Sequence, residues 1–177
     1  MSRRDPLADP EPLIRQVYGY IAYRIGPGPD ADDVTSETFE RAVKYRSSYD
    51  TRKGPPIAWL IAIARRCAND WLARRPPTAV ELDEVAGGGE LAEEVARRLD
   101  LDSAVALLSE RDRGLIALRF GADLSARQIA ELLGERTNTI EVALSRALDR
   151  LRELLENPPP VRPAGETHER SIRDSPV

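Results

Sequence analysis

Residues 124–155 restrict the possible folds more than any other part of this sequence, because they read as two amphipathic helices joined by a short turn. Ser125 followed three residues later by Gln128 forms a capping box, which marks a helix start. Gly134 suits the residue just after a helix end, and Thr137 suits the cap of a second helix. This spacing predicts a helix-turn-helix, the layout of a DNA-reading module.

The second of these helices has one apolar face and one face suited to DNA bases. The apolar face comprises Ile140, Leu144, Ala147, Leu148, Leu151 and Leu155. On the other face, Asn can pair with adenine, Val can pack on a thymine methyl, and Arg can bind guanine or a phosphate. The candidate DNA contacts are Arg127, Gln128, Thr137, Asn138, Thr139, Glu141, Val142, Ser145, Arg146 and Arg150. On packing alone any helical hairpin fits, and Glu141 fits a solvated position as well as a cytosine contact.

The net charge of −4 is unusual for a DNA-binding protein, so its distribution matters. Residues 1–75 carry 13 Lys and Arg against 10 Asp and Glu, whereas residues 76–110 carry 2 against 9. Residues 111–156 balance at 8 against 8. Because few phosphates can be neutralised by the helix-turn-helix, we expect it to bind DNA weakly and to need a second surface or a large partner.

The first 75 residues predict three helices, over about 11–25, 31–46 and 57–75. Asp30 suits the cap of the second helix, and Val43 falls on its predicted buried face. The third helix has the most regular apolar stripe in the chain, which comprises Ile57, Leu60, Ile61, Ala64, Ala68, Trp71 and Leu72. Cys67 borders this stripe, and we interpret it as a small buried hydrophobic residue.

The loop before the third helix and the polar face of that helix combine cationic, aromatic and amide side chains. This combination suits single-stranded DNA, because the backbone charge is neutralised while a base is stacked or hydrogen-bonded. A solvated basic face accounts for it equally well. The candidates are Tyr49, Arg52, Lys53, Arg65, Arg66, Asn69 and Arg74.

The sequence as a whole predicts an all-α protein of two small helical domains joined by a flexible linker. The expected domains span residues 10–75 and 101–156, with an acidic linker over 76–100 and a disordered Pro-rich tail over 157–177. Within 101–109, Asp102 or Ser103 could cap one helix, and Ser109 the next. No apolar run is long enough to cross a membrane, and the start lacks a signal core, so we expect a cytoplasmic protein. One cysteine excludes an internal disulfide, and we expect no metal, no cofactor and no enzymatic activity.

Three blocks in order, "DADDVTSETFERAVKY", "YDTRKG" with "AWLIAIARRCANDWLARR", and "LSERDRGLIALRFGADLSARQIAELLGERTNTIEVALSRALDRLRELL", resemble the extracytoplasmic-function (ECF) sigma factors of the bacterial sigma-70 family. The resemblance covers about residues 10–156. It implies a subunit that directs core RNA polymerase to promoter DNA and helps to open the duplex. It also implies an anti-sigma partner.

The resemblance assigns a role to each block. The first would dock on core polymerase through Asp33, Glu37, Phe39 and Arg41. The second would recognise and melt the −10 element through the candidates for single-stranded DNA, with Trp59 mainly packing. The helix-turn-helix would read the −35 element, and the linker would thread toward the RNA exit channel.

The sequence departs from the family pattern at two places. Many relatives read "ARN" where Ala64-Arg65-Arg66 stands, and "GTVKSRL" where residues 138–144 read "NTIEVAL". Two other functions also fit parts of the sequence. One is a sigma mimic that titrates an anti-sigma factor, and the other is a stand-alone helix-turn-helix regulator. Binding to core polymerase and promoter opening separate both from a sigma factor.

Overall fold

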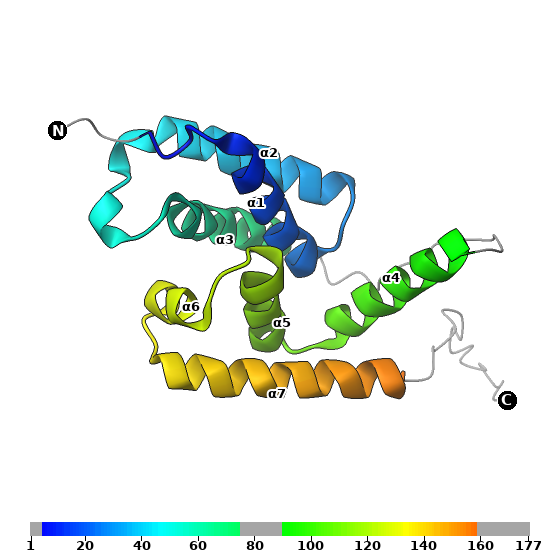
Figure 1. The fold of residues 1–177 in the computed structure, drawn as a ribbon. Helices are drawn as coiled ribbons and strands as arrows, with labels where there is room; N and C mark the ends of the chain where they lie inside the picture. Colours follow the sequence, from blue (N-terminus) through cyan, green and yellow to red (C-terminus); the bar gives the residue numbers. More distant parts are fainter. Residues whose placement is uncertain (1–4, 75–89, 159–177) are drawn as a thin grey trace, which may run out of the picture.

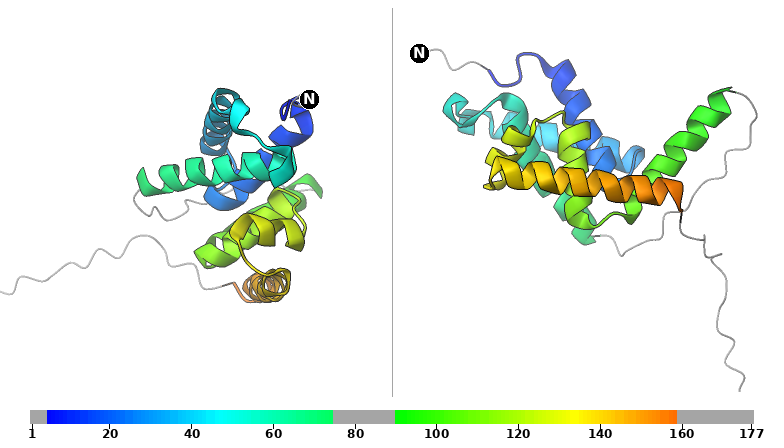
Figure 2. Two further views of the ribbon diagram at one scale, coloured as in Figure 1. Left: turned by 90° about the vertical axis from the view of Figure 1, so that its left-hand side faces the viewer. Right: turned by 60° about the horizontal axis from the view of Figure 1, so that its bottom comes forward.

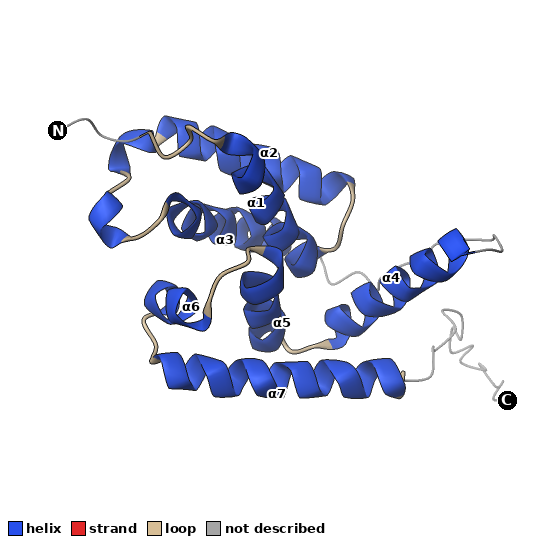
Figure 3. Ribbon diagram, in the orientation of Figure 1, coloured by secondary structure: helices blue, strands red, loops and turns tan. Residues whose placement is uncertain are grey.

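The computed structural model describes residues 5–74 and 90–158, with side chains from residue 97 onward in the second range. Every regular element in these two ranges is a helix, as predicted (Figure 3). The predicted linker segment 76–89 and the tail beyond residue 158 lie outside the described residues. The elements are α1 (Pro10–Ile25), α2 (Pro29–Lys44), η1 (Arg46–Ser48), η2 (Thr51–Lys53), α3 (Pro56–Arg74), α4 (Glu90–Leu107), α5 (Glu110–Ile116), η3 (Ala117–Gly121), α6 (Ala126–Leu133) and α7 (Thr137–Glu156).

Helices α1, α2 and α3 pack on one another around an apolar core (Figure 1). The predicted stripe of α3 contributes Ile57, Leu60, Ile61, Ala64 and Ala68 to that core. Cys67 is fully buried in it, which confirms its interpretation as a small hydrophobic residue. Two details of α2 differ from the prediction. The helix begins at Pro29 after Gly28, so Asp30 lies in the first turn and does not cap the helix. Val43 is 60% exposed, because the helix ends one residue later.

Helices α5, α6 and α7 form the helix-turn-helix and its support. Ser109 caps α5 by accepting a hydrogen bond from the Asp112 amide, and the capping box of Ser125 and Gln128 is present. Gly134 ends α6 in the left-handed conformation, with φ 71° and ψ 28°, as its position predicted. The predicted cap at Thr137 is wrong, since Arg136 takes that place without a side-chain bond.

Two further predictions in this half were wrong. Leu155 is exposed, because α7 extends past its supporting helices at this end. Helix α4 is continuous from Glu90 to Leu107, so neither Asp102 nor Ser103 caps a helix, and α4 crosses the expected boundary at residue 101. None of the helices in the described ranges is long and apolar enough to cross a membrane.

The N-terminal helices and the C-terminal helices pack directly on each other, which the sequence did not predict. The turn of π-helix η3 lies against α1, and α6 contacts α3. Buried residues of both halves, among them Val17, Ile21, Leu118 and Leu124, belong to one continuous apolar core. Helix α7 forms the layer farthest from α1 to α3 (Figures 1 and 2).

Candidate nucleic-acid interface

The outer face of α7 presents the side chains that the sequence predicted to read DNA. Ile140, Leu144 and Ala147 are buried and fix the orientation of the helix. Val142 is 51% exposed, an apolar side chain on an otherwise polar surface. Thr137 is half-buried, and the other predicted contacts of α7 are exposed, namely Asn138, Thr139, Glu141, Val142, Ser145, Arg146 and Arg150.

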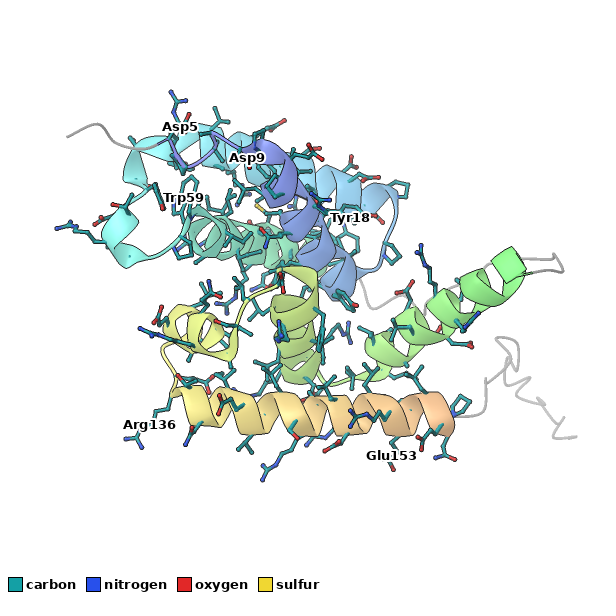
Figure 4. The ribbon with its side chains drawn as sticks, in the orientation of Figure 1. Asp5, Asp9, Tyr18, Trp59, Arg136 and Glu153 are labelled. Carbon is teal, nitrogen blue, oxygen red and sulfur yellow. The ribbon has the colours of Figure 1, made fainter. Side chains whose placement is uncertain are left out.

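The three arginines near this face differ in whether their guanidinium groups already have hydrogen-bond partners within the protein. Arg146 is exposed and makes no hydrogen bond or ion pair with any described residue. Arg150 donates through Nη1 to Asp112 Oδ2 of α5 at 2.9 Å, so one end of its guanidinium is already bound. Arg136 projects outward at the start of α7 (Figure 4) and is exposed. Arg136 is not among the contacts predicted from the sequence, although its place directly before the reading helix indicates it.

The two candidates on α6 are partly occupied by bonds within their own helix. The Gln128 Oε1 atom accepts hydrogen bonds from the Ser125 amide at 2.9 Å and from Ser125 Oγ at 2.8 Å. Arg127 is exposed and pairs with Glu131 at 3.1 Å. Gln128 therefore serves mainly to start the helix. The ion pair of Arg127 with Glu131 is exposed and weak, so Arg127 can leave the Glu131 carboxylate and bind a DNA phosphate at small cost in free energy.

The loop between α2 and α3 is held in place by Tyr49. The Tyr49 ring is only 9% exposed, packs on the Trp59 ring at 5.6 Å between centroids, and donates its hydroxyl to the Gly54 carbonyl at 3.0 Å. Burial, and then the charge of Asp50, raise the pKa of the Tyr49 phenol. Tyr49 is thus packed where an exposed stacking surface was expected, and Trp59 packs as predicted.

The exposed aromatic side chain beside this loop is Tyr45, which is not among the residues predicted from the sequence. Its ring is 52% exposed, and Lys44 Nζ lies 5.7 Å from the ring centroid. The predicted helix ran to residue 46 and so placed Tyr45 inside it, whereas the helix ends at Lys44. An aromatic ring and a cation at a helix end are groups that stack on and neutralise a single strand.

The two loop cations that the sequence predicted as DNA contacts, Arg52 and Lys53, are both exposed. Arg52 binds Asp50 through paired hydrogen bonds, the shortest 2.8 Å, and Lys53 stands next to it. Hydrogen bonds from Arg52 lower the pKa of Asp50 to about 2. The Asp50 carboxylate therefore stays ionised and fixes the loop end at any ordinary pH.

The polar face of α3 carries the remaining candidates. Arg66 and Arg74 are exposed, and Arg74 Nε donates to the Asp70 carbonyl at 2.9 Å. Arg65 is half-buried beside Tyr20. Asn69 is exposed on one side, while its Oδ1 accepts a hydrogen bond at 3.2 Å from Arg24 Nη2 of α1.

The predicted docking residues on α2 are Asp33, Glu37, Phe39 and Arg41, and one of them bonds to α3. Arg41 bonds both Glu37 and Asp70, and this links α2 to α3. Asp33 is exposed, and Phe39 is half-buried against the core. The four residues together present a charged surface with one aromatic side chain beneath it.

Comparison with known proteins identifies these two helical parts. The family model for sigma-70 region 2 matches residues 11–76, and that for sigma-70 region 4 matches residues 93–151. The chain is 34% identical over 126 residues to the RNA polymerase sigma factor SigV of Bacillus subtilis. The matched region covers 70% of this chain and 74% of SigV. The chain is 31% identical over 148 residues to the ECF sigma factor BldN of Streptomyces coelicolor, covering 78% of this chain and 56% of BldN.

Solved structures share the fold. The sigma factor RpoE of Bartonella quintana, in complex with the anti-sigma factor NepR, superposes with a TM-score of 0.64 at 21% identity, covering 83% of this chain and 94% of RpoE. CnrH, in complex with the cytosolic domain of CnrY, gives a TM-score of 0.57 at 24% identity, covering 82% and 80%. With regions 2 and 4 both matched, the chain belongs to the ECF sigma factors of the sigma-70 family, non-enzymatic subunits that bind core RNA polymerase and direct transcription initiation at specific promoters.

Proposed function

We propose that residues 101–156 read the −35 element through the exposed N-terminal half of α7. The observation that carries this proposal is the combination of exposed Asn138, Thr139 and Val142 with the free guanidinium of Arg146. Short polar groups at the start of a helix reach base edges, and an arginine one or two turns later reaches guanine or a phosphate. Arg136 adds a further cation at the turn.

Residues 10–75 recognise the −10 element and help to open it. Exposed Arg66 and Arg74 on α3, with Arg52 and Lys53 in the loop, support contacts to the backbone of a displaced strand. Asn69 supplies an amide for a base edge. Tyr49 positions the loop by packing on Trp59, and Tyr45 provides the accessible ring.

Helix α2 docks on core polymerase through Asp33, Glu37, Phe39 and Arg41. The bonds from Arg41 to Glu37 and Asp70 support this role, because they fix one carboxylate of α2 and one of α3 next to each other. The acidic segment 76–100 would connect the two DNA-binding parts across the polymerase, although its last residues belong to α4.

An anti-sigma factor is the partner that would hold this protein inactive. RpoE is bound to the anti-sigma factor NepR in one solved structure, and CnrH is bound to the cytosolic domain of CnrY in the other. We place the protein in the cytoplasm, where core polymerase and promoter DNA are found.

Run-off transcription with core polymerase of the same organism tests the proposed function. The templates are the DNA upstream of the protein's own gene and a genomic pool. We expect a discrete transcript that depends on the added protein, and its start maps the promoter. Core binding without any transcript would mean that the assay lacks the right promoter or an activator. The absence of both core binding and transcript would contradict the proposal and favour the sigma mimic or the stand-alone regulator.

A further inference from the structure

The side-chain amide of Asn69 is held from the inside of the protein by Arg24. Arg24 Nη2 of α1 donates to Asn69 Oδ1 of α3 at 3.2 Å. Asn69 is exposed, whereas Arg24 is only 5% exposed. One end of the amide is therefore turned toward a buried partner, and the other end is available at the surface that we assign to promoter opening.

The chemistry of Arg24 decides which end of the Asn69 amide is turned inward. A guanidinium has five N–H donors and no acceptor, and it stays protonated at any ordinary pH. It can bind only the amide oxygen, because an amide nitrogen in that place would set donor against donor. Asn69 Nδ2 is thus the outward end, and it makes no hydrogen bond with any described residue.

Arg24 can impose this orientation because its own guanidinium is fixed. Its Nη1 donates to the Glu110 carbonyl and its Nη2 also reaches Glu110 Oε1, each at 3.3 Å. The buried Tyr20 phenol lies beside it: burial raises the pKa of Tyr20, and the charges of Arg24 and Arg65 partly offset that rise. A buried guanidinium with partners on several sides has little freedom to move, so the Asn69 amide is oriented before DNA arrives.

An amide oriented in advance restricts the base edges that Asn69 can read. Asparagine pairs with adenine through two hydrogen bonds, one given by its nitrogen and one accepted by its oxygen. The oxygen of Asn69 is turned to Arg24, so the outward nitrogen offers two N–H donors and nothing else. Two donors fit an edge with two neighbouring acceptors, which are O2 and N3 in cytosine and O6 and N7 in guanine. In adenine and thymine the corresponding acceptors stand next to a donor.

We propose that Arg24 is a positioning residue for promoter recognition, which turns the Nδ2 donors of Asn69 toward the displaced strand. Asn69 then selects cytosine or guanine over adenine at the one −10 position that it meets. The bond joins α1 to α3, which pack on each other, so it does not depend on contacts with the helix-turn-helix. The inference rests on the proposed role of Asn69 in −10 recognition, which the experiment tests separately.

Binding of holoenzyme to single strands tests the proposal. The full chain is assembled with core polymerase, and the probes are fluorescent nontemplate-strand oligonucleotides of the mapped −10 region. Each position carries each of the four bases in turn. The readout is the ratio of affinities of one holoenzyme for two bases at one position. A variant that is merely less stable loses affinity for all probes together, and this ratio stays unchanged.

Two substitutions of Arg24 separate its donor chemistry from its packing. Arg24→Gln supplies both a donor and an acceptor, so it can bind either end of the Asn69 amide and no longer fixes its orientation. Arg24→Lys supplies donors only, so it keeps the orientation. Glu110→Gln is the matched control, because it changes the other partner of Arg24 and leaves the bond to Asn69 in place. Circular dichroism and thermal melting establish that these variants are folded.

We expect the wild type to prefer cytosine or guanine over adenine by about ten-fold at one position, and Asn69→Ala to abolish the preference there. Arg24→Gln should reduce the preference to less than about two-fold, because the released amide can also form its two bonds with adenine. Arg24→Lys and Glu110→Gln should keep the wild-type ratio.

Three results would overturn the proposal while the role of Asn69 at the promoter stands. A wild-type ratio in Arg24→Gln means that Arg24 does not orient the amide. A wild-type preference for adenine that Asn69→Ala abolishes means that the amide oxygen takes part in the contact. Equal loss of affinity for all four bases in Asn69→Ala means that the donors bind the DNA backbone. If Asn69→Ala instead binds every probe as the wild type does, Asn69 does not contact the strand, and its proposed role fails together with this inference.

Discussion

At the scale of single residues, Arg146 is the clearest candidate for a DNA contact, because the exposed face of α7 carries few cations and this one has no partner among the described side chains. We expect Arg146→Ala to reduce transcription from a −35-dependent promoter by about ten-fold, since loss of an arginine–guanine contact costs ~1–3 kcal/mol. Core binding should not change. Run-off transcription and core titration measure the two effects.

Arg152→Ala is the control for this substitution. Arg152 is an exposed arginine of the same helix, and it is ion-paired with Asp149 at 2.9 Å. It should leave transcription near the wild-type level. Equal activity of Arg146→Ala and wild type at a mapped promoter would remove Arg146 from the interface. If Arg146 instead contacts a phosphate, the slope of log affinity against log salt falls by about 1.

Asn69 is the residue that we expect to act in promoter opening. Asn69→Ala should lower the fraction of open promoter by about ten-fold, because a hydrogen-bonded base contact is lost. Closed-complex binding should stay near wild type. Permanganate footprinting of preassembled holoenzyme measures the bubble. Ala73→Ser, at an exposed position one turn later, is the control. Wild-type permanganate reactivity in Asn69→Ala would contradict the assignment.

At the scale of elements, the capping box sets the start of α6 and hence the angle of the helix-turn-helix. Ser125 accepts from the Gln128 amide, and Gln128 returns a bond to Ser125. Ser125→Ala should lower the free energy of unfolding by about 1 kcal/mol, because a helix-start amide loses its acceptor. Urea denaturation followed by circular dichroism measures the change. Ser47→Ala, at an exposed loop position, should change it by less than about 0.5 kcal/mol. A Ser125→Ala midpoint equal to wild type would show that the box does not stabilise the fold.

The elements also show what the sequence could and could not predict. Signals within one turn were reliable, such as the box at Ser125, the left-handed Gly134 and the apolar stripe of α3. The predicted ends of helices were less reliable. Tyr45 was placed inside a helix that stops at Lys44, because Lys44 and Tyr45 carry no strong stop signal. The burial of Tyr49 depends on Trp59, ten residues later, and periodicity does not encode such a contact.

At the scale of the whole molecule, the packing of the two halves could not be predicted for the same reason. The backbones of Gly19 in α1 and Gly121 in η3 meet so closely that a Cβ on either would clash with the other. The two residues are more than a hundred positions apart, and a single glycine in a helix gives no indication of its partner. Arg24 was read as one charge in a basic segment, whereas it is buried at the interface and touches both halves. The order of the family motifs predicted two domains, and the mutual contacts of those domains came only from the three-dimensional arrangement.

Charge and packing together predict how the free protein behaves with DNA. The net charge is −4, and residues 111–156 balance eight cations with eight anions, so few counterions are released on binding. In the structure α3 also contacts α6, so the two proposed DNA-reading parts lie side by side. We therefore expect the protein alone to bind duplex promoter DNA no more tightly than nonspecific binding at physiological salt, with Kd on the order of 10⁻⁴–10⁻⁶ M.

Fluorescence anisotropy with a labelled promoter duplex and a scrambled duplex measures this binding. The two curves should coincide for the protein alone, and only the promoter duplex should give a complex once core polymerase is added. Two effects of core polymerase add to the affinity for the promoter. Core supplies a large basic surface, and it separates the two reading helices to the promoter spacing. A nanomolar, sequence-specific complex of the free wild-type chain would contradict both parts of this reasoning, because it would require an open chain and a charge pattern that α7 does not have.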